Sequence, residues 1–177
     1  MSKPPDREGR VIKTVRTAEL AWGDRGEILA TAGIGSCVVV CLWNQAGQIG
    51  ALAHMMLPHS TDYGDAGEGS RIHSKALGIA PDLAIPYLVD LMKRITPQGT
   101  LSARLVGGGN MFQFTTGGGI LEDTPKKIIE NTRSALRDYA IPVVADCLGG
   151  PFGRRVDFDL TTGIVFIEDS SGALARI

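Results

Sequence analysis

Two apolar runs separated by a short turn constrain the fold of this chain most. The first run extends from Val38 to Trp43, and the second extends from Ile49 to Leu57. The segment between them, Asn44 to Gln48, contains only turn-compatible residues and includes a glycine. Two apolar runs joined by a short, glycine-containing linker predict a β-hairpin.

The register of this hairpin would bring a thiol and an imidazole together. If the loop is the four residues 44–47, Trp43 pairs with Gln48, and the same register places Cys37 opposite His54. Directly opposed residues lie on one face of a sheet, with Cβ atoms about 4.5–5.5 Å apart. A slip of one residue would place the two side chains on opposite faces, so the pairing is a hypothesis that depends on the loop length.

Length and composition indicate a globular domain with a sizeable core. The chain has 177 residues, of which 44% are apolar and 21% are charged. A net charge of −1 gives no strongly basic surface, so we expect no nucleic-acid partner. No run of about 18 apolar residues is present, so we expect no membrane insertion.

The termini and the cysteines give further expectations. Residues 1–10 are charged and lack an apolar core, which predicts a mobile tail and not a signal peptide, followed by a single domain over residues 11–177. Three cysteines without framework spacing predict free thiols and a cytoplasmic location.

Periodicity predicts many strands and two main helices. Apolar residues recur at helical spacing over residues 80–94. Because prolines are tolerated only in a first turn, we expect this first helix to start near Asp82. In the second helix Thr124 is the expected cap and Pro125 the first residue, and the helix runs to about Ala140. A turn is expected over residues 22–26, and strands are expected over residues 11–16, 27–31, 101–106, 141–145, 155–160 and 163–168. This pattern predicts an α/β layered sandwich of mostly antiparallel or mixed sheet, and it excludes a doubly wound parallel fold.

Cys37 is the first candidate for chemistry. It follows a Gly-Ile-Gly-Ser bend that can expose a side chain, and a neighbouring imidazole favours the reactive thiolate. His54 could then serve as general base, and the hydroxyl of Thr31 could orient its ring. The alternatives are a buried cysteine that acts as a small hydrophobe and a hydrogen-bonded core histidine.

The other thiols and imidazoles give weaker signals. Cys41 lies inside the apolar run and is expected in the core, and Cys147 has no assigned role. His59 and His73 lie in a polar loop and are expected to be solvated. A zinc site formed by Cys37, His54 and His59 has no supporting ligand spacing, so no metal or other cofactor is expected.

Glycine triplets and an arginine pair complete the candidates. The triplet at 107–109 does not match a phosphate-binding loop, so turn geometry is its expected role. Arg154 and Arg155 could bind acidic groups, but a solvated pair is the commoner outcome.

Several blocks together resemble one family. The run Gly33–Val40, with Ala53–Pro58 downstream, resembles the chemoreceptor glutamine deamidase family CheD. The resemblance continues in the same order through residues 82–86, 107–112, 141–145 and 149–156.

The resemblance implies a fold, an activity and a site. The family members are cysteine hydrolases with an α/β sandwich, and they convert glutamine side chains of chemotaxis receptors to glutamate and ammonia. The family's triad falls on Cys37 as nucleophile, His54 as base and Thr31 as the residue that orients the histidine. For such a reaction we expect backbone N–H groups around Ser36 and Cys37 to hold the oxyanion, with Gly35 and Ser36 as the oxyanion and positioning residues.

The resemblance also bears on partners. It implies receptor substrates, bound through their cytoplasmic helical region, and a CheC-type phosphatase as partner. The alternative function is a regulator of that phosphatase with little or no deamidation, and a monomer is expected in either case. The chain departs from the family pattern at Ala80, Pro125 and Ile128, which leaves the catalytic blocks unchanged and bears on partner and substrate choice.

Overall fold

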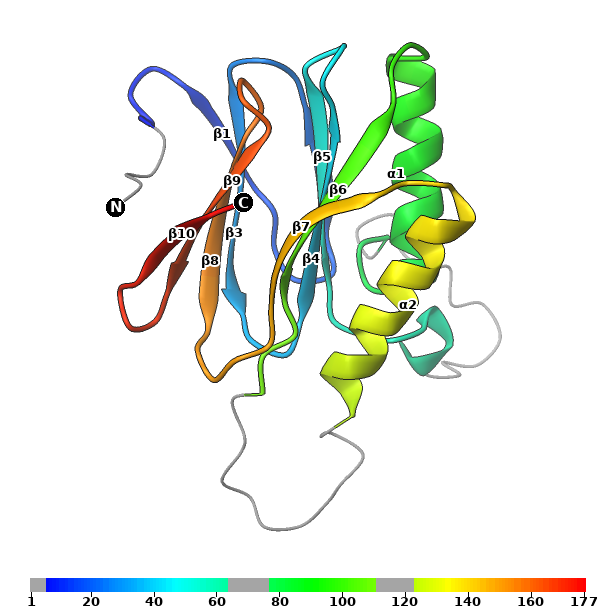
Figure 1. Cartoon of the computed structure of the whole chain (residues 1–177), viewed down its shortest axis with the longest axis vertical. Coiled ribbons are helices and arrows are strands. Elements are labelled where there is room, and N and C mark those ends of the chain that lie inside the picture. The colour runs from blue at the N-terminus through cyan, green and yellow to red at the C-terminus, as the bar shows by residue number, and fades with distance from the viewer. Residues whose placement is uncertain (1–5, 64–76, 111–122) are drawn as a thin grey trace.

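Two five-stranded sheets pack face to face, and two helices cover the free face of one of them (Figure 1). This computed structural model describes residues 6–63, 77–110 and 123–177. The fold is therefore α/β with two mixed sheets and two helices in these ranges, which confirms the predicted layered sandwich.

The sheet without helices is called the outer sheet. Its strand order is β1-β3-β8-β9-β10, and only the β1–β3 pair is parallel. The bounds are β1 Val11–Thr14, β3 Glu27–Ile34, β8 Arg154–Asp159, β9 Ile164–Asp169 and β10 Leu174–Arg176.

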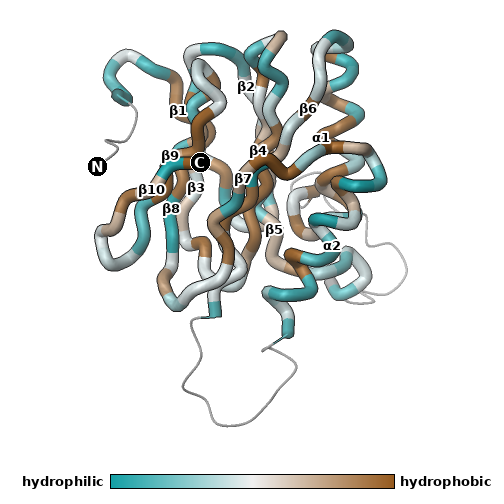
Figure 2. The backbone as a smooth tube through the Cα atoms, in the orientation of Figure 1, coloured by the Kyte–Doolittle hydropathy of each residue, from teal (hydrophilic) through white to brown (hydrophobic). Residues whose placement is uncertain are grey.

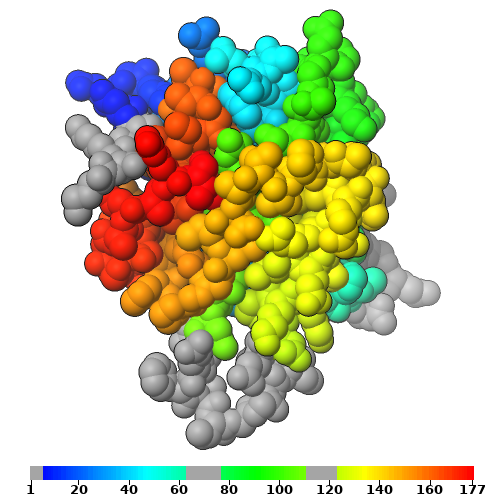
Figure 3. Space-filling view, viewed as in Figure 1, coloured from blue at the N-terminus to red at the C-terminus, as the bar shows by residue number. Residues whose placement is uncertain are grey.

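The sheet beneath the helices is called the central sheet. Its strand order is β2-β5-β4-β6-β7, and only the β6–β7 pair is parallel. The bounds are β2 Leu20–Gly23, β4 Val38–Asn44, β5 Ile49–Met55, β6 Leu101–Gly107 and β7 Val143–Leu148. The helices are α1 Pro81–Ile95, α2 Thr124–Asp138 and the short 3₁₀ helix η1 Ser60–Tyr63. Figure 3 shows β7, the edge strand of this sheet, beside α2 on the molecular surface.

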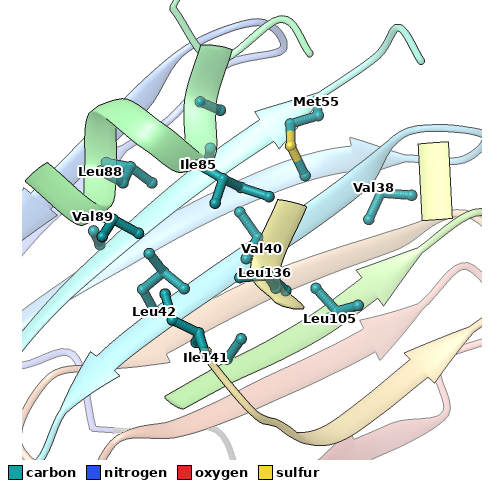
Figure 4. Packing of buried hydrophobic residues seen from close by; sticks show 14 of the residues in the cluster. Val38, Val40, Leu42, Met55, Ile85, Leu88, Val89, Leu105, Leu136 and Ile141 are labelled. Atoms are coloured by element: carbon teal, nitrogen blue, oxygen red, sulfur yellow. The ribbon is translucent and has the colours of Figure 1, made fainter. Parts of the chain in front are cut away.

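Strand β4 is buried on both faces, which explains its continuous apolar sequence. Val38, Val40 and Leu42 pack against residues of α1 and α2 (Figure 4). The alternate residues Val39 and Cys41 pack toward the outer sheet. Figure 2 shows this apolar band along the central strands, with hydrophilic residues in the N-terminal segment, on α2 and on β8.

The predicted hairpin forms, but the expected register is wrong by two residues. Asn44 pairs with Ile49, so the loop is residues 45–48, and Val39 lies opposite His54 in place of Cys37. Asn44 stays in the ladder because its side chain closes the turn from within the strand. Its amide oxygen accepts a hydrogen bond from the Gly47 N–H at 3.0 Å, and its Nδ2 donates to the Gln98 carbonyl at 2.9 Å.

The helices lie close to their predicted ranges. Helix α1 begins at Pro81, one residue before the expected start, and it continues through Pro86. The cap predicted for α2 is wrong by one residue, because Asp123 occupies the cap position and Thr124 is the first helical residue. The side chain of Asp123 makes no capping hydrogen bond.

Strands β2, β7 and β10 differ most from the sequence prediction. Trp22 and Gly23, which were expected in a turn, belong to β2 and pair with Ala51 and Gly50 of β5. Strand β10 was not predicted, and the strand expected over 141–145 lies at 143–148. Within the described ranges, no helix has the length and apolar character needed to cross a membrane.

The N-terminal segment contacts strand β8. The Arg7 guanidinium pairs with the carboxylate of Asp157, and Arg10 pairs with Asp159 at 2.6 Å. Both carboxylates are buried. The domain boundary expected after residue 10 stays a prediction.

Candidate active site

The candidate residues gather at the end of the sandwich where β3 of the outer sheet leads into β4 of the central sheet, near the lower end in Figure 1. The chain bends at Gly35 and Ser36, and Cys37 follows immediately before β4. The register of β3 against β8 shifts between Thr31 and Ile34, so the strand is irregular just before the bend.

The backbone and the side chain of His54 are hydrogen-bonded to different segments of the chain. Its backbone N–H donates to the Glu19 carbonyl at 3.0 Å, and its carbonyl accepts the Ala18 N–H at 2.8 Å. Its side chain is fully buried, and Nδ1 lies 2.8 Å from the Thr31 hydroxyl oxygen. Because Thr31 belongs to β3 and His54 to β5, this hydrogen bond joins the two sheets.

The second ring nitrogen of His54 is buried and unpaired. Nε2 has no hydrogen-bond partner among the described residues. Burial lowers the pKa of His54 to about 4, so the imidazole is neutral at neutral pH. In the tautomer with its proton on Nδ1, the ring donates to Thr31 and leaves the Nε2 lone pair free to accept a proton.

This shift predicts that acid destabilises the protein through His54. Because its pKa is lower in the folded state than the ordinary value of 6.5, the unfolded chain binds more protons between pH 6.5 and 4. The contribution of neutral His54 to the free energy of unfolding is therefore complete above about pH 6.5. It is lost as the pH falls toward 4, and the loss is on the order of 3 kcal/mol. Urea unfolding across this range should show a steeper pH dependence for the wild type than for His54→Gln. Equal slopes would contradict the assignment, and the exposed His59 provides the matched control His59→Gln.

Cys37 is not hydrogen-bonded to His54 in the described structure. The thiol is half-buried; burial raises its pKa, and its own backbone N–H partly offsets that rise. Val39 lies opposite His54, and Cys37 is two residues before Val39, just outside β4. Because successive side chains of a strand alternate between its faces, we expect Cys37 on the face of Val39, which packs toward the outer sheet.

The backbone of the bend is fixed by the glycine triplet after β6. The Gly108 N–H donates to the Cys37 carbonyl at 2.7 Å, and the Gly109 N–H donates to the Gly35 carbonyl at 2.8 Å. A Cβ atom at Gly107 would lie 2.2 Å from the Cys37 carbonyl oxygen, so only glycine fits there. No carbonyl in the described part of the chain accepts a hydrogen bond from the N–H groups of Ser36 or Cys37.

The remaining thiols and imidazoles lie apart from this arrangement. Cys41 is fully buried in the core, as predicted, and Cys147 is half-buried in β7. His59 Nε2 contacts the Asn131 side chain at 3.0 Å. His73 lies outside the described residues. No group of three His, Cys, Asp or Glu side chains in the described ranges is arranged to hold a metal ion.

Comparison with known proteins identifies the family. A family model described as "CheD chemotactic sensory transduction" matches residues 56–169, well over half of the chain. The chain belongs to the CheD family. This finding confirms the resemblance seen in the sequence, although the match to the CheD model begins just after His54.

Similar CheD proteins match a longer stretch. The chain is 34% identical over 153 residues to a "Probable chemoreceptor glutamine deamidase CheD" of Oceanobacillus iheyensis, covering 86% of this chain and 87% of the relative. It is 32% identical over 160 residues to a Clostridium botulinum protein of the same name, covering 89% of this chain and 93% of the relative. Matches of this length necessarily include the segment from Thr31 to His54.

Proposed function

We propose that this CheD-family chain is a protein-glutamine deamidase that acts on chemoreceptors through a cysteine thioester. The names of the two relatives support the reaction and the substrate class. The observation that carries the mechanism is the buried hydrogen bond between Thr31 and His54, because it orients an imidazole whose Nε2 is unpaired.

The reaction follows from these groups. Cys37 Sγ attacks the carbon of the glutamine carboxamide as His54 Nε2 takes the thiol proton. The tetrahedral intermediate collapses when His54 returns that proton to the leaving nitrogen, which departs as ammonia. Water, deprotonated by His54, then hydrolyses the thioester, and the products are glutamate and the free thiol.

The resting site favours neutral groups. Burial raises the pKa of the Cys37 thiol and lowers the pKa of the His54 imidazole, so thiol and imidazole are both uncharged at neutral pH. Proton transfer therefore accompanies the attack on bound substrate and does not precede it. Rotation of the Cys37 side chain toward Nε2 is the required movement, and catalytic hydrogen bonds commonly tighten only when substrate binds.

The bend supplies the groups that would stabilise the oxyanion. The N–H groups of Ser36 and Cys37 have no carbonyl partner in the described ranges, while the neighbouring carbonyls of Gly35 and Cys37 are fixed by the glycine triplet. Each such donor contributes about 3 kcal/mol to transition-state stabilisation in related acyl transfers. Gly35 and Ser36 thus act through the backbone.

Incubation with a chemoreceptor fragment tests the proposal. The cytoplasmic helical region of a receptor, which contains the glutamines, should release ammonia and gain the mass expected when an amide NH₂ is replaced by OH. A fragment split at a backbone bond would indicate a peptidase. An unmodified fragment, together with binding of a CheC-type phosphatase that does not require the Cys37 thiol, would favour the regulator.

Alkylation of the free thiols tests the neutral resting state. Because burial raises the pKa of Cys37, its labelling by iodoacetamide should increase with pH through the alkaline range, without a plateau near neutrality. Cys41 should resist labelling in the folded protein because it is fully buried. Peptide mapping after timed labelling gives both rates. Rapid labelling of Cys37 that is independent of pH above pH 6 would indicate a preformed thiolate and contradict this account.

A further inference from the structure

Arg154 contacts backbone segments of both sheets that border the candidate site. It opens β8, and its backbone pairs with Ile34, the last residue of β3 before the bend. Its half-buried guanidinium crosses to the central sheet, where Nη2 donates to the Gly149 carbonyl and Nη1 donates to the Gly107 carbonyl at 3.5 Å. The sequence predicts a solvated arginine pair, and for Arg154 these contacts show that the prediction is wrong.

The two carbonyls belong to the turns that support Cys37. The Gly107 carbonyl also accepts the Gly149 N–H at 2.9 Å, which ties the end of β6 to the end of β7. The next residues along, Gly108 and Gly109, donate to the carbonyls of Cys37 and Gly35. The Arg154 guanidinium is therefore connected to both sides of the bend through its hydrogen bond to Gly107, the backbone of residues 107–109 and the hydrogen bonds that Gly108 and Gly109 donate.

These turns consist of glycine backbone in conformations that other residues rarely adopt. Gly107, Gly108 and Gly149 have positive φ angles of 117°, 63° and 76°, and such glycine-rich backbone is costly to hold in one conformation. They have no side chains of their own with which to pack. A guanidinium presents several donors in a rigid fork, so one side chain can hold two carbonyls from different strands.

We infer that Arg154 is a positioning residue for the deamidation reaction. It fixes the two glycine turns, and through them it keeps the Gly35–Cys37 bend in the geometry that presents the thiol and the N–H groups of Ser36 and Cys37. The inference rests on the proposed function. Because Arg154 acts on the reacting backbone and not on distant parts of the substrate, its loss should lower kcat and leave KM nearly unchanged.

Two substitutions and one matched control test this role. Arg154→Gln should lower kcat by up to about 100-fold, the penalty that a small misplacement of reacting groups can impose. Arg154→Lys should recover part of the rate, since an ammonium can reach one carbonyl but does not reproduce the fork. The control is Arg155→Gln. Arg155 is the adjacent residue, but it is exposed and pairs with Glu168, so its variant should keep the wild-type kcat.

Hydrogen exchange separates failure of this inference from failure of the proposed function. In Arg154→Gln the amide protons of Gly108 and Gly109 should exchange faster than in the wild type and in Arg155→Gln, whether or not the protein deamidates anything. Unchanged protection of these two amides would overturn the inference. A wild-type kcat in Arg154→Gln, or equal losses of kcat in Arg154→Gln and Arg155→Gln, would also overturn it. A wild type that modifies no receptor fragment would overturn the proposed function and leave the exchange result as the test of Arg154.

Discussion

Replacement of Cys37 by alanine should abolish release of ammonia from a chemoreceptor fragment while the fold is retained. Without the thiol no thioester can form, and loss of a catalytic nucleophile lowers turnover by a factor on the order of 10⁴–10⁶. The side chain is only half-buried, so its truncation leaves little cavity, and the circular dichroism spectrum and melting temperature should stay close to those of the wild type.

The matched control for this prediction is Cys147→Ala. Cys147 is also a half-buried free thiol, but it lies in β7 on the far side of β6 from β4. This variant should release ammonia at nearly the wild-type rate. Ammonia release that persists in Cys37→Ala, or that disappears equally in both variants, would be incompatible with Cys37 as the nucleophile.

Replacement of His54 by glutamine should have the second largest effect on activity. General acid–base catalysis typically contributes 10²–10⁴-fold, so kcat should fall by about that factor. Thr31→Val, which removes the hydroxyl bonded to Nδ1, should reduce kcat less, and Thr31→Ser, which keeps a hydroxyl, should stay near the wild type. Steady-state ammonia release measures all three rates.

A second histidine provides the control for this series. His59 follows β5 closely in the sequence, yet it is exposed and contacts Asn131 of α2. His59→Gln should therefore keep its activity. If His54→Gln turned over receptor glutamines as fast as His59→Gln, the imidazole would not be the base.

Local sequence patterns predicted most of the architecture. The apolar run of β4 needed no tertiary information, because a strand buried on both faces has a continuous apolar sequence. The periodicity of α1 and α2 placed both helices within a few residues of their ends. Strands β2 and β10 lacked such a signal, since β2 is short and ends in glycine and every residue of β10 is exposed.

The site was less accessible to local reasoning because its contacts are not local. The hairpin register failed at Asn44, whose side chain contacts the distant Gln98 carbonyl and holds the residue in the strand. The two-residue error overturned the direct pairing of Cys37 with His54, while a shared face for the two side chains stays a prediction, because a shift of two residues preserves strand alternation.

Contacts between the two sheets are the hardest features to predict from a sequence pattern. The bond from Thr31 to His54 forms only when β3 packs over β5, so the sequence offered Thr31 as a residue that could orient the ring without showing the contact. The hydrogen bonds from Arg154 to the Gly107 and Gly149 carbonyls likewise depend on how the two sheets pack against each other. The glycine triplet at 107–109 was the available signal, and its link to Cys37 appears only in three dimensions.

The acyl-enzyme itself provides the most direct test of the account. Wild-type protein should be mixed with a glutamine-containing receptor peptide, quenched in acid during turnover and digested, and its cysteine peptides should be weighed. The account predicts that the Cys37 peptide carries the receptor peptide with the loss of one ammonia, and that hydroxylamine removes this adduct as a hydroxamate. Deamidation that proceeds with no adduct on Cys37, or with the adduct on Cys147, would contradict it.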